Sequence, residues 1–213
     1  MNETMRSIQH CIWIAAVIIP ILGGRPASAQ DGFQFGVSAG VQNTLLYSSY
    51  RSEINVKNAF CPLVTADIEY RFSPLFGIQS GMGYALYSQN TSKFRNNFSY
   101  LTVPAYVKLG GFKKERKFAL SFFGGPNFKY LISASHVTQH EKNDISEYTK
   151  QFHIDYTLGI GLKYQLNENL VMESQLTGSF LGGSFNRATT DFFILKNTNY
   201  GVVLGLKYHL HTR

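Results

Sequence analysis

Cysteine is scarce in this chain of 213 residues, which contains only Cys11 and Cys61. Cys11 lies in an N-terminal segment with the features of a signal peptide, so the mature chain keeps only Cys61. A single cysteine cannot form an internal disulfide, and this excludes a disulfide-stabilised scaffold. We expect Cys61 to be a small structural residue in a loop or at the end of a strand.

Charged residues and long apolar runs are also few. Asp, Glu, Lys and Arg make up 15% of the chain, and aromatic residues make up the same share. Designs of soluble proteins aim for about 25–35% charged residues on the surface, so this exterior is short of charge for contact with water. Apart from 11–24, which has 14 residues, no long apolar run is present. A transmembrane helix needs about 20 residues, so membrane-spanning helices are excluded.

The first 29 residues have the layout of a secretory signal peptide. Arg6 precedes the apolar run at 11–24, and Ala27-Ser28-Ala29 precedes Gln30. A basic start, a short apolar stretch and a small-x-small site predict cleavage between Ala29 and Gln30. A retained membrane anchor is the alternative, although the run is short for a span. We therefore predict a signal peptide over 1–29 and one domain over 30–213.

The charge of the predicted mature chain does not indicate a nucleic-acid partner. Removal of Glu3, Arg6 and Arg25 leaves 18 basic and 12 acidic residues, a net charge of 18 − 12 = +6. Nucleic-acid-binding domains gather their basic residues on one face. Here the basic residues are scattered, apart from the segment 113–117.

Apolar and polar residues alternate along most of the mature chain. Phe152, Ile154, Tyr156 and Leu158, for example, alternate with His153, Asp155 and Thr157. This period of two is the pattern of a half-buried strand. A tilted strand needs about 9–11 residues to cross a bilayer. Eight segments of about this length show the pattern: 33–42, 63–72, 75–87, 100–109, 118–130, 152–164, 170–180 and 200–210.

The connections between these segments alternate between short and long. Short turns are predicted at 73–74, 111–117 and 167–169, and long polar connections at 43–62, 88–99, 131–151 and 181–199. An even number of strands with short turns at one end and long loops at the other is typical of outer-membrane barrels. The sequence therefore predicts an all-β, eight-stranded antiparallel up-and-down transmembrane β-barrel, with both termini on the periplasmic, short-turn side.

The direction of the two faces separates this barrel from a soluble, lipocalin-like carrier, which would point its apolar face inward. Glycines such as Gly159 and Gly161 recur on the polar face, where they suit a crowded lumen better than a wet surface. Aromatic residues fall near both ends of the apolar face, as in the girdles of membrane barrels. Pro104 removes a ladder hydrogen bond, so we predict a bulge there, with a locally irregular strand as the alternative.

This interpretation assigns both faces. The apolar face contacts lipid through residues that include Leu101, Val103, Leu158, Ile160, Leu162, Leu204 and Leu206. Enclosed charges must be paired, and we predict a structural polar network in the lumen from Asp67, Glu69, Arg71, Lys108, Asp155, Lys163, Glu173 and Lys207, with Lys129 on the same face. Eight strands leave no wide channel.

Several short motifs resemble those of the PorT-like outer-membrane β-barrel proteins. The segment Tyr100-Leu-Thr-Val-Pro-Ala-Tyr-Val-Lys108 is similar to a strand of that family, as are 124–126, 155–161 and 205–208. The resemblance implies a barrel in the outer membrane, and one branch of the family serves protein secretion. The chain departs from such barrels at its end, because Tyr208 is followed by five further residues instead of ending the chain.

No constellation for catalysis stands out. His136 and His140 are four residues apart, near Glu141 and Asp144, but the order of a zinc-binding HExxH helix is missing. We therefore predict no catalytic residues, no metal and no cofactor. The predicted partners are the lipid bilayer, the barrel-insertion machinery and an extracellular or envelope protein bound by the loops. A secretion-assembly component, a soluble carrier and an outer-membrane lipid acylase or protease are the alternatives.

Overall fold

The computed structural model describes residues 32–48, 59–90, 94–111, 117–138, 141–181 and 195–210. The predicted signal peptide, including the site between Ala29 and Gln30, lies outside the described residues. Among the described residues, no helix has the length and apolar character needed to cross a membrane.

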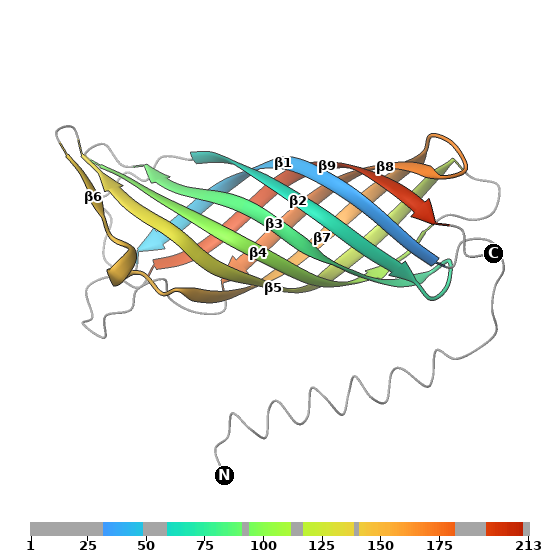
Figure 1. Ribbon diagram of the computed structural model, residues 1–213, viewed down its shortest axis with the longest axis horizontal. Helices are drawn as coiled ribbons and strands as arrows, with labels where there is room; N and C mark the ends of the chain where they lie inside the picture. Colours follow the sequence, from blue (N-terminus) through green and yellow to red (C-terminus); the bar gives the residue numbers. More distant parts are fainter. Residues whose placement is uncertain are drawn as a thin grey trace, which may run out of the picture.

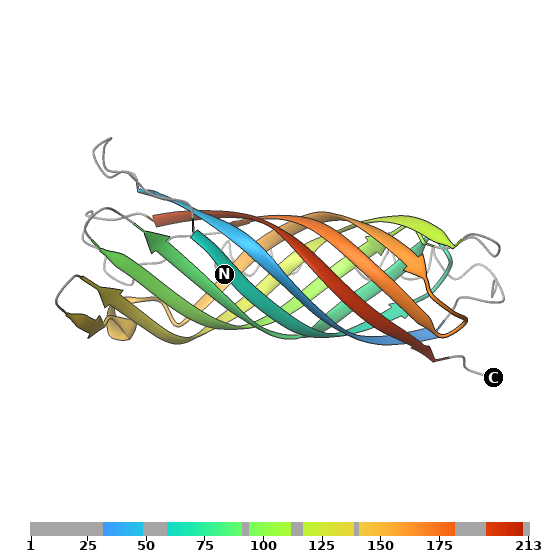
Figure 2. The same cartoon turned by 90° about the horizontal axis from the view of Figure 1, so that it is seen from above.

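Eight long antiparallel strands form a closed barrel, which confirms the predicted fold class (Figures 1 and 2). The wall closes where the first strand pairs with the last, from Phe33 opposite Leu210 to Ser48 opposite Leu195. The wall strands are β1 (Gly32–Ser48), β2 (Ala59–Arg71), β3 (Phe76–Asn90), β4 (Arg95–Leu109), β5 (Phe118–Val137), β7 (Phe152–Gln165), β8 (Leu170–Leu181) and β9 (Leu195–Leu210).

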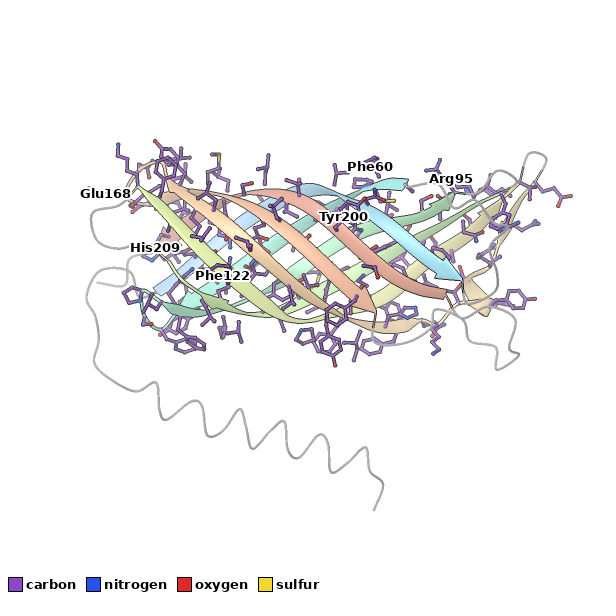
Figure 3. All side chains as sticks on the ribbon, turned by 180° about the vertical axis from the view of Figure 1, so that it is seen from behind. Phe60, Arg95, Phe122, Glu168, Tyr200 and His209 are labelled. Carbon is purple, nitrogen blue, oxygen red and sulfur yellow. The ribbon has the colours of Figure 1, made fainter. Side chains whose placement is uncertain are left out.

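The two faces of the wall are inverted relative to a soluble barrel. In β7, the side chain of Leu158 is 61% exposed, whereas that of Asp155 is fully buried in the lumen. The exterior side chains seen in Figure 3 are mostly carbon, with Phe122 and Tyr200 among those exposed. The structure exposes Val103, Leu158, Ile160, Leu162, Leu204 and Leu206 on this exterior.

Leu101 also belongs to the outer face but is only half-buried. It lies between Tyr84 of β3 and Tyr130 of β5 in the register of the sheet. Both tyrosines are themselves exposed. Their rings therefore account for the partial cover of Leu101, at the level where the loop-end aromatic girdle was predicted.

The strands reach further toward the long-loop end than predicted. Residues 88–99, predicted as a long connection, are mostly the ends of β3 and β4. Polar side chains there bind one another across the ladder: Ser88 donates to Asn97 Oδ1 at 2.9 Å, and Arg95 Nε donates to Ser88 Oγ at 3.0 Å. A polar composition therefore does not end the strands at this point.

Segment 131–151, predicted as an outer loop, also contains regular structure. β5 continues to Val137, the short strand β6 (Lys142–Asp144) pairs with it, and a 3-10 turn, η1 (Ser146–Tyr148), follows. Figure 1 shows β6 and η1 at the end of the barrel opposite the arrowhead of β9. We call residues 131–151 the loop-end extension.

The prediction of a bulge at Pro104 is wrong. The register between β4 and β5 shifts at Ser99 and Tyr100, whereas Pro104 stays in register opposite Asn127. On the other side, the pairing of β4 with β3 skips from Ala105 to Thr102. Since proline has no N–H, it removes a ladder bond without requiring an extra residue.

We predict that Leu158→Arg destabilises the barrel by about 2–4 kcal/mol, because the arginine would lie near the middle of a lipid-facing strand. Leu109→Arg is the matched control: Leu109 is also exposed, but it ends β4 at the short-turn end. There the cost falls to about 0–1 kcal/mol. Denaturant unfolding in lipid vesicles measures both. Equal effects at the two positions would contradict a bilayer centred on Leu158.

Candidate functional site: the lumen

The inward side chains fill the lumen in three layers. An ion-pair network occupies the short-turn end, a small polar cavity lies above it, and an apolar cluster closes the long-loop end. The layers follow from the alternation of the strands, because every second residue of each strand points into the lumen.

Glu69 of β2 is the centre of the network. Its carboxylate accepts hydrogen bonds from Arg71 Nε at 2.7 Å, Lys163 Nζ at 2.8 and 3.0 Å, Lys207 Nζ at 2.7 Å and Lys108 Nζ at 3.2 Å. All five side chains are at most 3% exposed. The four cations come from β2, β7, β9 and β4, so one carboxylate ties together strands on opposite parts of the wall.

Glu173 of β8 is the second anion of the network. It lies 2.7 Å from Lys108 Nζ and 2.7 Å from Lys207 Nζ. Glu69, Lys108, Glu173 and Lys207 therefore form a closed ring of alternating charge. Each lysine of the ring bridges two carboxylates, which is the pairing that buried charges require.

Asp67 joins the network indirectly. Its carboxylate accepts from Ser38 Oγ at 3.0 Å and from Gln79 Nε2 at 3.0 Å. The Gln79 oxygen in turn accepts from Lys207 Nζ at 3.4 Å. Two carboxylates face four cations in the core of the network, and Asp67 supplies a third negative charge nearby. With Asp67 included, three negative charges lie close to the four cations of the network.

Glycines make room for the long side chains of the network. A Cβ atom on Gly36 would lie 2.6 Å from Lys207 Cγ, and one on Gly161 would lie 2.9 Å from the Oε1 atom of Glu173. Gly159 has the same role for an aromatic ring, since its Cβ would lie 2.3 Å from Phe123 Cζ. The predicted role of glycine in a crowded lumen therefore has a specific geometric cause at these positions.

A cavity of about 70 Å³ lies above the network. Its lining is mainly hydroxyl and amide groups, including Ser38, Gln42, Thr102, Asn127, Thr157 and Gln175. Liquid water occupies about 30 Å³ per molecule, so the cavity has room for about two waters with several polar partners. It is far smaller than the roughly 300 Å³ of an ordinary ligand pocket.

An apolar cluster, which we call the plug, closes the lumen toward the long-loop end. It consists of Ala85, Tyr87, Phe98, Tyr100, Leu131 and Ala134, all buried, with Leu63 and Ile145 packed against it. The rings of Tyr87 and Tyr100 meet edge to face at 5.5 Å. Lys129 pairs with Asp155 at this level, and its Nζ lies 4.1 Å from the centre of the Tyr87 ring.

Sequence patterns missed the plug, although a signal was present. Ala85 and Tyr87 continue the inward period of β3, and Phe98 and Tyr100 that of β4, but all four are alanine or aromatic. Apolar residues at inward-facing positions, which are otherwise polar in these strands, are therefore the sequence signal for the plug.

The loop-end extension holds the plug from above. Ile145 N–H donates to the Ala134 carbonyl at 3.0 Å, Ala134 N–H donates to Ser146 Oγ at 2.9 Å, and Leu131 N–H donates to the Gln151 carbonyl at 2.7 Å. These bonds occupy the side of β5 that β7 leaves free beyond Phe152. Ile145 is thereby placed against the plug.

All eight residues of the predicted lumen network are buried in the lumen. Six of them, Glu69, Arg71, Lys108, Lys163, Glu173 and Lys207, form one network. Asp67 is attached through Gln79, and Asp155 lies outside the network, at the level of the plug, where it pairs with Lys129.

The histidine pair considered for zinc gains no support. His136 lies 2.6 Å from the Asn96 side-chain oxygen, through its Nδ1 atom, and His140 is outside the described residues. Among the residues that the structure describes, no three His, Cys, Asp or Glu side chains are grouped so that they could hold a metal ion. Cys61, predicted in a loop or at a strand end, is the third residue of β2 and is buried.

We predict that Glu69→Gln lowers the free energy of unfolding by about 3–5 kcal/mol, because removing one partner leaves buried charges uncompensated. Glu141→Gln, at an exposed position, is the matched control and should change stability by less than about 0.5 kcal/mol. Urea unfolding in detergent micelles, followed by heat-modifiable migration on a gel, measures both. If Glu69→Gln behaves like Glu141→Gln, the network does not carry the stability assigned to it.

The fold agrees with what the chain is similar to. Among solved structures, Neisserial surface protein A (NspA) matches with a TM-score of 0.57 at 13% sequence identity, over 86% of this chain and 100% of that chain. Ail, the attachment invasion locus protein of Yersinia pestis, matches with a TM-score of 0.45 at 13% identity, over 84% and 99% of the two chains. At such identity, the likeness to NspA shows the fold alone.

No curated protein matches the chain. A family model, described as an outer membrane protein beta-barrel domain, matches residues 26–193, which is well over half of the sequence. The match includes every wall strand except β9, which closes the barrel against β1. The chain therefore belongs to the outer membrane protein beta-barrel domain family.

Proposed function

We propose that this outer-membrane barrel is a non-enzymatic scaffold that presents its long-loop end to a protein partner and conducts no solute through its lumen. The observation that carries the proposal is the closure of the lumen at two levels. The network around Glu69 fills one end, and the plug around Tyr87 and Tyr100 fills the other. What remains between them is a cavity of about 70 Å³.

The orientation is part of the proposal. Residues 1–29 direct export and are removed between Ala29 and Gln30, and the insertion machinery then places the short turns in the periplasm. β1 begins and β9 ends at the short-turn end, so both ends of the barrel domain face the periplasm. The long-loop end then faces outward, as in bacterial barrels generally.

The loop-end extension is the partner-binding surface in this proposal. Tyr148 is 71% exposed, and Lys142, Asn143 and Asp144 of β6 are exposed beside it. Ladder pairs with β5 and the hydrogen bonds of Ser146 hold these residues in place. A surface that is already ordered loses less conformational entropy when a partner binds.

The resemblance of Tyr100–Lys108 to PorT-like proteins supports a second candidate, a component of a protein secretion assembly. In that role the exposed extension would contact another subunit of the assembly. The soluble-carrier alternative has no support, since the apolar face points outward and leaves the lumen to charged and polar groups.

We predict that the polar cavity is closed to solutes from both ends. Thr157→Cys, in a Cys61→Ser background, should stay unreactive toward a small water-soluble maleimide in the folded barrel. Adding Tyr87→Ala should make the cysteine at position 157 reactive, because this change opens the plug. Tyr84→Ala is the matched control, since Tyr84 lies on the outer face of β3, the strand that also contains Tyr87. It should leave the labelling rate unchanged. Rapid labelling of Thr157→Cys alone, with stepwise conductance in planar bilayers, would overturn the closed lumen.

The partner surface has its own test. A photo-activatable residue in place of Tyr148 should form a discrete protein adduct in intact cells, and Lys142→Ala with Asp144→Ala should weaken it at least tenfold. The same photo-activatable residue at Glu168, exposed at the opposite end, is the control. A scaffold role for the extension fails if position 148 gives no adduct beyond that of position 168.

A further inference from the structure

The outer wall contains a hollow of about 450 Å³ over β1–β4. Its floor is formed by Ser80 of β3 and Ala105 of β4, which lie directly opposite each other in the ladder. Its rim is formed by larger side chains, among them Phe33, Tyr70, Ile78 and Val107. The size of the hollow falls within the range of about 300–1,000 Å³ that is usual for ligand sites.

The hollow coincides with the irregular part of the β3–β4 ladder. The pairing skips from Ala105 to Thr102, around Pro104. The Ser80 hydroxyl donates to the Pro104 carbonyl at 2.9 Å. This bond ties the floor together where ladder bonds are missing, and it leaves that hydroxyl committed to the protein.

The chemistry of the hollow suits a hydrocarbon chain. None of its lining residues is charged, and most of them are aromatic or aliphatic. The exposed apolar surface around it is continuous with the band that faces lipid in an outer-membrane barrel. An unfilled hollow against lipid forfeits dispersion contacts, so the surrounding hydrocarbon is drawn into it.

The position of the hollow selects the leaflet at the short-turn end. The rings of Phe33 and Tyr70 lie 4.7 Å apart, and those of Tyr70 and Phe72 lie 4.8 Å apart, in an aromatic cluster next to the short turns. Aromatic girdles mark the headgroup level. Ser80 is four residues into β3, about 13 Å along the strand, so the floor lies at the depth of acyl chains from this leaflet.

We propose that the hollow over Ser80 and Ala105 is a specific site for one acyl chain of a phospholipid in the leaflet at the short-turn end. The bound chain covers the part of the ladder that Pro104 interrupts, and it stabilises the folded barrel by binding only to that state. The site depends on the barrel lying in the membrane and is independent of the proposed scaffold role.

The test fills the hollow from within the protein. Ala105→Leu occupies the floor, and Ala39→Leu is the matched control, since Ala39 is exposed on the outer face of β1 away from the hollow. Native mass spectrometry of the full barrel, released from vesicles of phosphatidylethanolamine and phosphatidylglycerol, counts the retained lipids. Wild type and Ala39→Leu should keep one phospholipid that Ala105→Leu loses.

A second variant and a second measurement keep the test decisive. Ser80→Val fills the hollow from β3 and should also lose the lipid, with folding checked by heat-modifiable migration. A chain-labelled spin-probe lipid should show one fewer motionally restricted lipid per barrel for both filling variants. Equal lipid counts in all four proteins would overturn the site. So would a dimer that wild type forms and Ala105→Leu does not, because the occupant would then be a second copy of the chain.

Discussion

Eight strands enclose a lumen that only side chains can fill, and every charge placed there must find a partner within it. Glu69 is the shared partner of four cations, from β2, β4, β7 and β9, and Glu173 supplies a second negative charge to two of them. Because these strands are distributed around the ring, the ion pairs run across the barrel, whereas the ladder bonds run along its wall. The two sets of bonds together fix the cross-section at the short-turn end.

This crowding also explains the residues that carry no charge. Lys207 can extend into the lumen because Gly36, its ladder partner on the neighbouring strand, has no side chain. The same rule places the ring of Phe123 against Gly159. Glycine therefore serves in this barrel as the partner of a long or bulky side chain, and its cost to strand stability is offset by the packing it permits.

Alternation in the sequence was enough to predict the eight wall strands, the closed barrel and the burial of Asp67, Glu69 and Lys207 in the lumen. It could not predict the pairing within the network. A period of two shows whether a residue points inward or outward, but it does not show which side chain the residue contacts or at which level along the barrel it lies. The central position of Glu69 depends on the register of several strands, which only the closed ladder fixes. Asp155 shows the limit, since it was grouped with Glu69 but pairs with Lys129 in another layer.

Other features had weak or misleading local signals. β6 reads Lys-Asn-Asp, a polar run without periodicity, and it is a strand because β5 offers it an edge. The polar segment 88–99 was predicted as a loop. Its side chains instead form hydrogen bonds between β3 and β4, from Ser88 to Asn97 and from Arg95 to Ser88. At Pro104 the missing N–H was recognised correctly, but the ladder tolerates it without the extra residue of a bulge.

The two ends of the lumen are closed by different forces, and this difference bears on how the protein can vary. The network depends on shared ion pairs, in which Glu69 contacts four cations and two of its lysines also contact Glu173, so a change in one member affects its partners. The plug depends mainly on apolar burial, which is non-directional, together with the Lys129–Asp155 pair, and it shares no side chain with the network. Substitutions that reshape the loop-end extension therefore alter Ile145 and the plug without unbalancing Glu69. The charged end can stay fixed while the long-loop end varies.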